Sequence, residues 1–298
     1  MAYLDWIAHC NSCDLTAFWP FRCAGRHLGW VHGAQLASLA QHTDVFVIDG
    51  DGVRIAPDLD TPAARTDALA AVTDGWIADG LLPGWRGERY RAAASLDETP
   101  LFAIERSAAP LLGLRAWGVH VNGFVRDRDT LSMWVAQRAK DRPVAPGKWD
   151  HIIAGGLPAD LGPRANLIKE AGEEAGLSAA IAATARPTGH VSYRFVDRCN
   201  RLRPDTLLTY DLELPPGLEP RNTDGEVDHF ELWPIARVAE TVRDTAAFKT
   251  NCNLVIIDFL VRHGVLAPGD TPGYEAIVSG LRQPFPALPQ DRQPAVDP

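Results

Sequence analysis

Hydrophobic and polar positions follow strand-like or helix-like periods along most of the chain. Residues 116–125 and 132–138 are rich in β-formers and flank the polar segment 126–130, a pattern that predicts a hairpin. Pro163 suits the first turn of a helix, and residues 164–177 then alternate apolar and charged positions at a helical period without another proline. The pattern therefore predicts strands followed by a helix in the middle of the chain.

The remaining periodic segments suggest a division of the chain. Further strands are predicted at 45–48, 53–55, 152–154, 190–196 and 206–213, and further helices at 35–40, 61–80 and 248–263. This order indicates a small α+β N-terminal module at residues 1–110 and an α/β domain at residues 111–282. Residues 283–298 are rich in proline and polar side chains, so we expect a disordered tail.

Three carboxylates follow a pair of glycines at helical spacing. Glu170, Glu173 and Glu174 lie on one face of the predicted helix, where like charges repel by roughly a few tenths of a kcal/mol per pair. A bound cation would relieve this repulsion, and oxygen ligands favour Mg²⁺ or Mn²⁺, which also bridge to phosphates. A solvated acidic helix face is the alternative, and the glycines at 155 and 156 favour the metal site.

The stretch 155–177 resembles the Nudix box, G-x5-E-x7-R-E-U-x-E-E-x-G-U, where U is a bulky aliphatic residue. The matching positions are Gly155, Glu170, Glu173, Glu174, Gly176 and Leu177. Two positions depart from the pattern: Lys169 replaces the arginine and Leu161 replaces the first glutamate. The resemblance implies an α/β Nudix fold, with a mixed β-sheet between helices in an α-β-α sandwich, preceded by the α+β module.

In these departures the box resembles that of one Nudix branch, the proteins related to the Nudix part of fungal thiamine pyrophosphokinase fusions. Beyond the box, similar segments lie at 101–106, 117–124, 146–156, 210–215, 224–230 and 248–264. The resemblance implies a diphosphatase that converts oxidised or damaged thiamine diphosphate into the monophosphate and phosphate. Two alternatives stay open: a nucleoside-diphosphate-linked substrate such as ADP-ribose or a dinucleotide, and a non-catalytic Nudix-fold binding module.

The box supplies the expected metal ligands. Glu170 and Glu174, one helical turn apart, are the first choice, and Glu173 adds a direct or water-mediated contact. The carbonyl group of Gly155 would complete the ligand shell, with that of Gly156 as an alternative. Mg²⁺ or Mn²⁺ bound there would neutralise the phosphoryl oxygens and acidify the attacking water.

Nudix enzymes usually supply a further carboxylate downstream of the box. Glu226 is the candidate here, either as a metal ligand or as the base that takes the proton from water, with Asp224 and Asp228 as competitors. Together with Glu170 and Glu173, Glu226 is expected to be catalytic. An ordinary acidic residue in a turn is the alternative for Glu226.

Four residues before the box are candidates for substrate binding. His120 and Asn122 alternate on a predicted strand, so they face the same side and are expected to line the pocket. Lys148 would meet the diphosphate, and the ring of Trp149 would stack on a flat heterocycle. Ordinary structural roles are the alternatives for all four.

Charge and hydropathy narrow the class of partner. A net charge of −9 disfavours a general nucleic-acid binder. The sequence contains no run of eighteen or more apolar residues and no basic N-terminal segment followed by an apolar stretch. We therefore expect a cytoplasmic protein that acts on a small-molecule diphosphate without a membrane or nucleic-acid partner. Dimerisation, or shaping of the pocket, are the two roles considered for the N-terminal module.

The cysteines permit one other metal site. The spacing Cys10-x2-Cys13-x9-Cys23-x3-His27 has ligand types that suit zinc, but it contains a single C-x-x-C pair. Five cysteines in a chain of 298 residues fit a reducing compartment better than a disulfide scaffold. We expect ordinary thiols, with zinc as the alternative.

Overall fold

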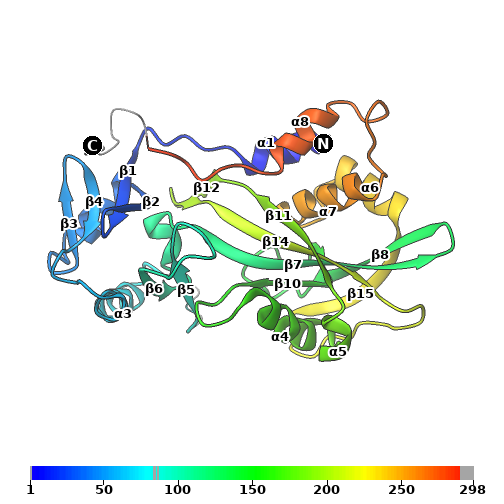
Figure 1. Cartoon of the computed structure of the whole chain (residues 1–298), viewed down its shortest axis with the longest axis horizontal. Coiled ribbons are helices and arrows are strands. Elements are labelled where there is room, and N and C mark those ends of the chain that lie inside the picture. Colours follow the sequence, from blue (N-terminus) through cyan, green and yellow to red (C-terminus); the bar gives the residue numbers. More distant parts are fainter. Residues whose placement is uncertain (1, 83–84, 86, 289–298) are drawn as a thin grey trace. The chain divides into compact units, whose positions relative to one another are not determined.

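Strands β7 (Ala116–Asp127) and β8 (Thr130–Arg138) form the hairpin that the alternating pattern predicts. The computed structural model of the chain describes residues 2–82, 85 and 87–288. The chain forms two compact units (Figure 1). The first unit, with the hairpin and the box, joins residues 1–11, 117–193 and 206–283, and the second joins the remaining segments.

The first unit contains a seven-stranded sheet with the order β11-β14-β7-β8-β15, to which β10 adds on β7 and β9 adds on β8. The bounds are β9 (Trp149–His151), β10 (Ile153–Gly156), β11 (Arg186–Ser192), β14 (Asp205–Glu213) and β15 (Val227–Pro234). The strand predicted near 190–196 ends at Ser192, and its last residues form the separate short strand β12 (Phe195–Val196). Strand β15 was not predicted.

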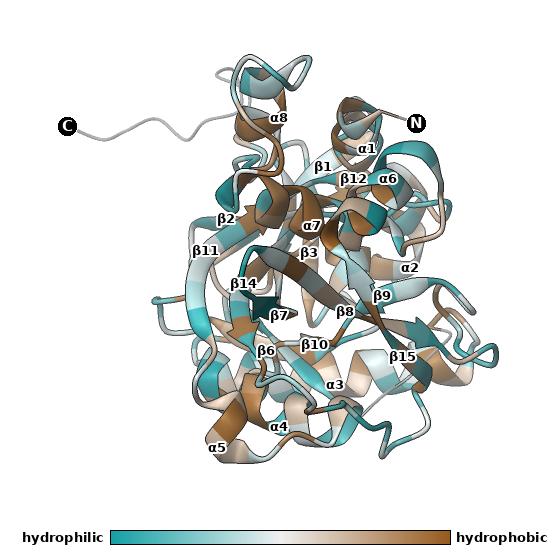
Figure 2. Cartoon of the chain, turned by 90° about the vertical axis from the view of Figure 1, so that its right-hand side faces the viewer, coloured by the Kyte–Doolittle hydropathy of each residue, from teal (hydrophilic) through white to brown (hydrophobic). Residues whose placement is uncertain are grey.

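Helices cover both faces of this sheet. Helix α4 (Pro163–Ala175), the predicted box helix, lies on one face with the short helix α5 (Ala179–Ala182), and α7 (Thr250–Arg262) lies on the other face (Figures 1 and 2). Three more helices belong to this unit: α1 (Tyr3–Cys10), α6 (Ile235–Asp244) and α8 (Tyr274–Gly280). The predicted α/β arrangement, with a sheet between helices, is therefore confirmed.

Helix α7 is buried around its whole circumference. All positions from 252 to 260 are buried, and its ribbon is mostly brown, the colour of hydrophobic residues, in Figure 2. Helices α1 and α6 both pack against α7, and α6 also contacts strands β8 and β15; α1 is joined to α6 by Tyr3, which donates a hydrogen bond to the Ala239 carbonyl group, and by Trp6, which donates to that of Val242. Covered by the sheet and by these helices, α7 buries even its polar residues Asn253 and Asp258.

The second unit has a four-stranded sheet with the order β2-β1-β4-β3. Its strands are β1 (Phe18–Cys23), β2 (Arg26–His32), β3 (Phe46–Asp49) and β4 (Gly52–Ile55), of which β3 and β4 match the strands predicted at 45–48 and 53–55 and pair as an antiparallel hairpin. The predicted helix at 61–80 is α3 (Pro62–Ala78), and the Thr61 hydroxyl group caps it by accepting a hydrogen bond from the Ala64 amide group. Strand β1 was not predicted, and its Pro20 argues against a strand in the sequence.

Smaller elements complete the second unit. They are η1 (Gly33–Gln35), α2 (Leu36–Leu39), η2 (Ala109–Leu112), β13 (Leu202–Arg203) and the paired strands β5 (Arg89–Ala92) and β6 (Phe102–Glu105). The predicted module at 1–110 and this unit share residues 12–110, whereas residues 2–11 belong to the first unit. Of the predicted tail at 283–298, residues 289–298 lie outside the described residues.

Candidate metal centre

Helix α4 is held against the sheet by small and aliphatic side chains. Leu167, Ala171 and Ala175 are almost fully buried on the core side of the helix. The helix ends at Gly176, whose φ of +61° is the left-handed conformation that favours glycine, and the Leu177 amide group then donates to the Ala171 carbonyl group. This packing fixes which face of α4 is turned towards strand β10.

The three glutamates of α4 differ in their surroundings. Glu170 is 9% exposed, and Glu174 is partly buried and accepts a hydrogen bond of 2.8 Å from the Ala154 amide group of β10. Glu173 is exposed and forms an ion pair of 2.7 Å with Lys169. Two carboxylates thus lie between α4 and β10, while the third lies at the solvent edge.

The electrostatics of Glu174 indicate a place for a cation. Burial raises the pKa of Glu174 well above its ordinary value, and the negative charges of Glu170 and Asp150 raise it further. The hydrogen bond from Ala154 and the positive charge of Lys249 oppose this shift without cancelling it. A divalent cation between the carboxylates of Glu170 and Glu174 would remove the cause of the repulsion, and such oxygen donors suit Mg²⁺ or Mn²⁺.

Gly155 of β10 makes room for the Glu170 carboxylate. A Cβ atom added at Gly155 would lie 2.4 Å from Cδ of Glu170, closer than nonbonded carbon atoms approach. The neighbouring Gly156 carbonyl group accepts a hydrogen bond of 2.9 Å from Asn166, which fixes β10 to α4. Gly155 of the box is therefore explained by close packing of the strand against a carboxylate.

Gly155→Ala should displace the Glu170 carboxylate and lower diphosphate hydrolysis about a hundredfold, since a shift of about 1 Å in an active site has an effect of that size. Steady-state kinetics on the purified variant measures the effect. Gly172→Ala in the same box is the matched control, because an added Cβ there meets nothing nearer than 4.0 Å. It should keep full activity and raise helix stability by about 0.5–1 kcal/mol. Equal activity in both variants would contradict the packing argument.

Lys169 takes the position of the box arginine. Its ammonium group lies 2.7 Å from the Glu173 carboxylate and 3.4 Å from that of Glu170. Glu170 and Glu173 together raise the pKa of Lys169 although its partial burial lowers it. One ammonium group thus spans both carboxylates, without the two-pronged contact that an arginine makes.

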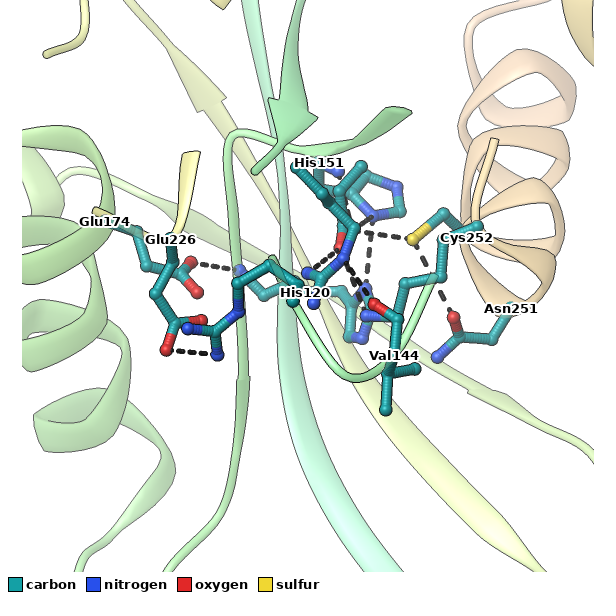
Figure 3. A network of polar contacts seen from close by, with 12 residues as sticks. His120, Val144, His151, Glu174, Glu226, Asn251 and Cys252 are labelled. Carbon is teal, nitrogen blue, oxygen red and sulfur yellow. Dashed lines mark hydrogen bonds and ion pairs between the residues drawn. The ribbon is translucent and has the colours of Figure 1, made fainter. Parts of the chain in front are cut away.

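Glu226 lies in the loop before β15, and this loop is attached to the end of α4. The Thr223 hydroxyl group donates to the carbonyl groups of Gly172 and Glu173, and the Arg221 amide group donates to that of Ala175. The Glu226 carboxylate is paired with Arg142 at 2.5 Å, and Figure 3 shows this pair together with Glu174.

The competing acids of this loop have other partners. Asp224 accepts a hydrogen bond of 2.8 Å from the Glu226 amide group, so it shapes the loop. Asp228 is exposed and paired with His229 at 3.0 Å. Of the three downstream acids, Glu226 is the one that pairs with a cation from the segment before the box.

His120 and Asn122 do share one face of β7, but the structure buries both on the side of α7. His120 is 4% exposed and its Nδ1 atom lies 3.1 Å from Nδ1 of His151, whereas Asn122 is fully buried and donates to Asp211 at 3.1 Å. The expectation that they line an open pocket needs correction for this reason. Period-two spacing gives a common face but does not say which layer covers that face.

Lys148 and Trp149 lie where β9 begins. The Lys148 ammonium group donates a hydrogen bond of 2.5 Å to the Ala246 carbonyl group, so its partner in this structure is the backbone before α7. The Trp149 ring is half-buried and packs edge-on against Trp233 and His229, with ring centroids 4.7 Å and 5.5 Å away. Trp149 therefore belongs to a partly open aromatic cluster.

A buried polar cluster lies between the sheet and α7 (Figure 3), and His120 is the member that the sequence singled out as a candidate site residue. Asp150 is its centre: the thiol group of Cys252 donates to Oδ1 at 2.7 Å, and Arg138 and Lys249 contact Oδ2 at 2.9 Å and 3.1 Å. Burial opposes ionisation of Asp150, but Lys249 and the neighbouring His151 outweigh it and hold the pKa of Asp150 well below its usual range. A buried but ionised aspartate results.

The other cluster members respond to the same burial. Burial lowers the pKa of His120 well below its ordinary value, helped by His151 and Lys249, so this imidazole is neutral. Burial and the charge of Asp150 raise the pKa of the Cys252 thiol well above its usual range. The segments 146–156 and 248–264, which resemble the Nudix branch, contain most of these residues, and that was the signal available in the sequence.

The spacing considered for zinc near the N-terminus does not gather its side chains. Among the described residues, the histidine, cysteine and acidic side chains that lie close enough to share a metal ion do not include Cys10, Cys13, Cys23 or His27. Burial raises the pKa of the Cys10 thiol to about 12, and burial lowers the pKa of His27 to about 4. His27 also contacts the Gly29 carbonyl group at 2.9 Å.

Comparisons with known proteins place these features in context. The family model described as NUDIX domain matches residues 116–251, and the one described as Domain of unknown function (DUF4743) matches residues 2–116. Nudix hydrolase 24, chloroplastic, of Arabidopsis thaliana is 41% identical over 94% of this chain and 77% of its own length. Nudix hydrolase 20, chloroplastic, of the same plant is 38% identical over the same shares.

A solved structure gives a weaker match. DR0079 from Deinococcus radiodurans is 20% identical and aligns with 56% of this chain and 97% of its own, with a TM-score of 0.39. No helix among the described residues has the length and apolar character needed to cross a membrane.

The expected cytoplasmic location is wrong, because both plant relatives are chloroplastic proteins. That expectation rested on the missing secretory signal. Transit peptides are amphipathic and lack the apolar core of a secretory signal, so its absence does not distinguish the two compartments.

Proposed function

Since this chain belongs to the Nudix hydrolase family, and is therefore a phosphohydrolase acting on diphosphates, we propose that Glu170 and Glu174 hold the divalent cation of its reaction. The observation that carries this proposal is the pair of carboxylates packed between α4 and β10, where Gly155 makes room for one and Ala154 donates to the other. Mg²⁺ or Mn²⁺, when bound, supplies charge neutralisation and a more acidic water. The Gly155 carbonyl group would complete the ligand set.

Two further glutamates, Glu173 and Glu226, have roles in the proposed reaction, and each is positioned by a basic residue. Lys169 pairs with Glu173 at the solvent edge, where the Glu173 carboxylate would contact the cation directly or through a water molecule. Glu226 takes the proton from the attacking water, and Arg142 positions its carboxylate by the ion pair at 2.5 Å. The Glu226 side chain is 32% exposed, so water reaches it.

The substrate that we favour is a thiamine-diphosphate-like compound in an oxidised or damaged form. The support is the resemblance of the box, with Lys169 in place of arginine, and of the segments around it to the thiamine-related Nudix branch. The partly open ring of Trp149 offers a stacking surface for a flat heterocycle beside the strand that leads into the box. Lys148, released from the Ala246 carbonyl group, would meet the diphosphate.

A substrate panel tests this proposal. Thiamine diphosphate, its oxidised analogues, ADP-ribose, a dinucleotide and common nucleoside di- and triphosphates are incubated with and without Mg²⁺, and intact products are identified by mass spectrometry. Metal-dependent release of phosphate and thiamine-type monophosphates is expected. Cleavage of ADP-ribose or the dinucleotide instead would reject the substrate and keep the chemistry, whereas binding without any turnover would favour a binding module.

Trp149→Ala should raise KM for a heterocyclic diphosphate about tenfold and change kcat much less, because stacking contributes about 0.5–1.5 kcal/mol to binding. Steady-state kinetics on the preferred substrate measures both constants. Trp85→Ala, at a ring that is 58% exposed, is the matched control and should leave both unchanged. A large loss of kcat with unaltered KM would assign Trp149 a different role.

A further inference from the structure

Four metal-ligating side chains converge in the first unit, on the side of the sheet that α7 covers. They are His120 of β7, Asp150 and His151 of β9, and Cys252 in the first turn of α7. All four are at least 96% buried, and one ligand atom from each lies within 4.8 Å of the others. We propose that these residues form a buried structural zinc site, distinct from the magnesium site on α4.

The distances are close to those of a tetrahedral site. The two imidazole Nδ1 atoms are 3.1 Å apart, Nδ1 of His151 is 3.7 Å from Oδ1 of Asp150, and Sγ of Cys252 is 2.7 Å from the same oxygen. Metal–ligand bonds of about 2.0–2.3 Å arranged tetrahedrally separate their ligand atoms by about 3.3–3.6 Å, whereas the ligand atoms here lie within 4.8 Å of one another. Shifts of less than about 1 Å would therefore admit the ion.

The donor set selects the metal. Two imidazole nitrogens, one thiolate and one carboxylate oxygen suit Zn²⁺, whereas Mg²⁺ and Ca²⁺ prefer oxygen ligands alone. The thiolate of Cys252 and the carboxylate of Asp150 would balance the two charges of the ion, and the proton of the thiol group would leave on binding. The closed, fully protein-made coordination shell is typical of a structural site.

Neighbouring side chains already orient the carboxylate. Arg138 and Lys249 both contact Oδ2 of Asp150, which leaves Oδ1 turned towards Cys252 and His151. Outer groups that fix a ligand in this way are a regular part of metal sites. The ion would join β7, β9 and α7, and so tie the sheet to its covering helix.

Two Nδ1 atoms that face each other share at most one proton. Without an ion, one imidazole of the pair donates and the other accepts across the 3.1 Å contact. With the ion, both nitrogen lone pairs point at one centre. The convergence of a thiol and a carboxylate oxygen on the same point distinguishes this group from an ordinary pair of bonded histidines.

The test is the metal content of the full-length protein purified without a metal-affinity step. Mass spectrometry of the metals should find about one zinc per chain, lost in Cys252→Ala and His120→Ala. Cys10→Ala, at a buried cysteine of the same unit outside the cluster, and Glu174→Gln, in the magnesium site, should both keep the zinc. Loss of zinc in either control would overturn the assignment.

Cobalt replacement keeps the test decisive if the variants do not fold. Wild-type protein stripped with a chelator and reloaded with Co²⁺ should show a thiolate-to-cobalt absorption band and tetrahedral visible bands, and the stripped protein should melt at a lower temperature. Folded wild-type protein that carries no zinc and gives no such band with Co²⁺ would show a hydrogen-bonded cluster and overturn the proposal. Neither readout depends on hydrolysis, so this result is independent of the proposed function.

Discussion

Glu174→Gln is expected to lower kcat for diphosphate hydrolysis about a thousandfold, since a catalytic metal ion contributes several kcal/mol to transition-state stabilisation. Glutamine keeps the size of the side chain, and its carbonyl oxygen can still accept the hydrogen bond from the Ala154 amide group. The change therefore removes the charge and little else. Initial rates at increasing Mg²⁺ concentration, on the substrate found with the panel, measure the loss and the metal affinity together.

Glu213→Gln is the matched control for this prediction. Glu213 lies at the exposed end of β14, outside the box sequence, and its variant should retain wild-type rates. Glu170→Gln should resemble Glu174→Gln, because the two carboxylates are expected to share the ion. If both box variants kept rates within about threefold of the wild type, a difference under 1 kcal/mol, the metal assignment would fail.

Arg262→Met is expected to lower the free energy of unfolding by about 3 kcal/mol at pH 7, because it removes the guanidinium group that pairs with two largely buried carboxylates and leaves Asp258 with Arg282 and Asp211 with His263. Arg262 donates to both Asp211 and Asp258, and the Asp258 side chain is 2% exposed. Methionine preserves the apolar stem, so the effect reports the lost charge. Chemical denaturation followed by circular dichroism measures the change.

This loss should shrink in acid. Burial would raise the pKa of Asp211, but the hydrogen bonds from His263 and Arg262 outweigh it and hold the pKa below its ordinary value. The stabilisation from this lowered pKa is present above the ordinary value of about 3.9 and disappears as the pH falls through the folded-state value. Without Arg262 the carboxylate takes up a proton more readily, so the two proteins should differ less at pH 3 than at pH 7.

Arg26→Met controls for loss of an exposed ion pair. Arg26 is paired with Glu98 at 2.9 Å, but its side chain is 52% exposed, so its replacement should cost less than about 1 kcal/mol. An Arg262→Met variant no less stable than Arg26→Met, or a difference from wild type that grows on acidification, would contradict the account of this network.

Local sequence patterns predicted the elements that carry the box. The β7–β8 hairpin, the helix at α4 and the closing helix at α7 follow from periodicity and from Pro163, and the α/β Nudix fold that the box implies is confirmed by the family match. The separation of four residues between Glu170 and Glu174 also indicated that both lie on the same face of the helix. These features depend on residues that are close in sequence.

Features that depend on distant residues were not predictable in the same way. His120 and Asn122 share a face, but their burial depends on α7, which comes more than a hundred residues later. Asp150 contacts Cys252 across a separation of 102 residues. Periodic patterns relate residues that are near in sequence, so they do not predict this contact. Helix α1 likewise packs on α7, although its position in the sequence suggested the N-terminal module.

The most direct test of the central claim is anomalous X-ray diffraction from crystals grown with Mn²⁺ and measured at the manganese absorption edge. We expect an anomalous peak between the carboxylates of Glu170 and Glu174 and the backbone of Gly155, and its loss in crystals of the Glu174→Gln variant. A peak elsewhere, or none at this position while the wild-type enzyme still hydrolyses diphosphates with Mn²⁺, would contradict it.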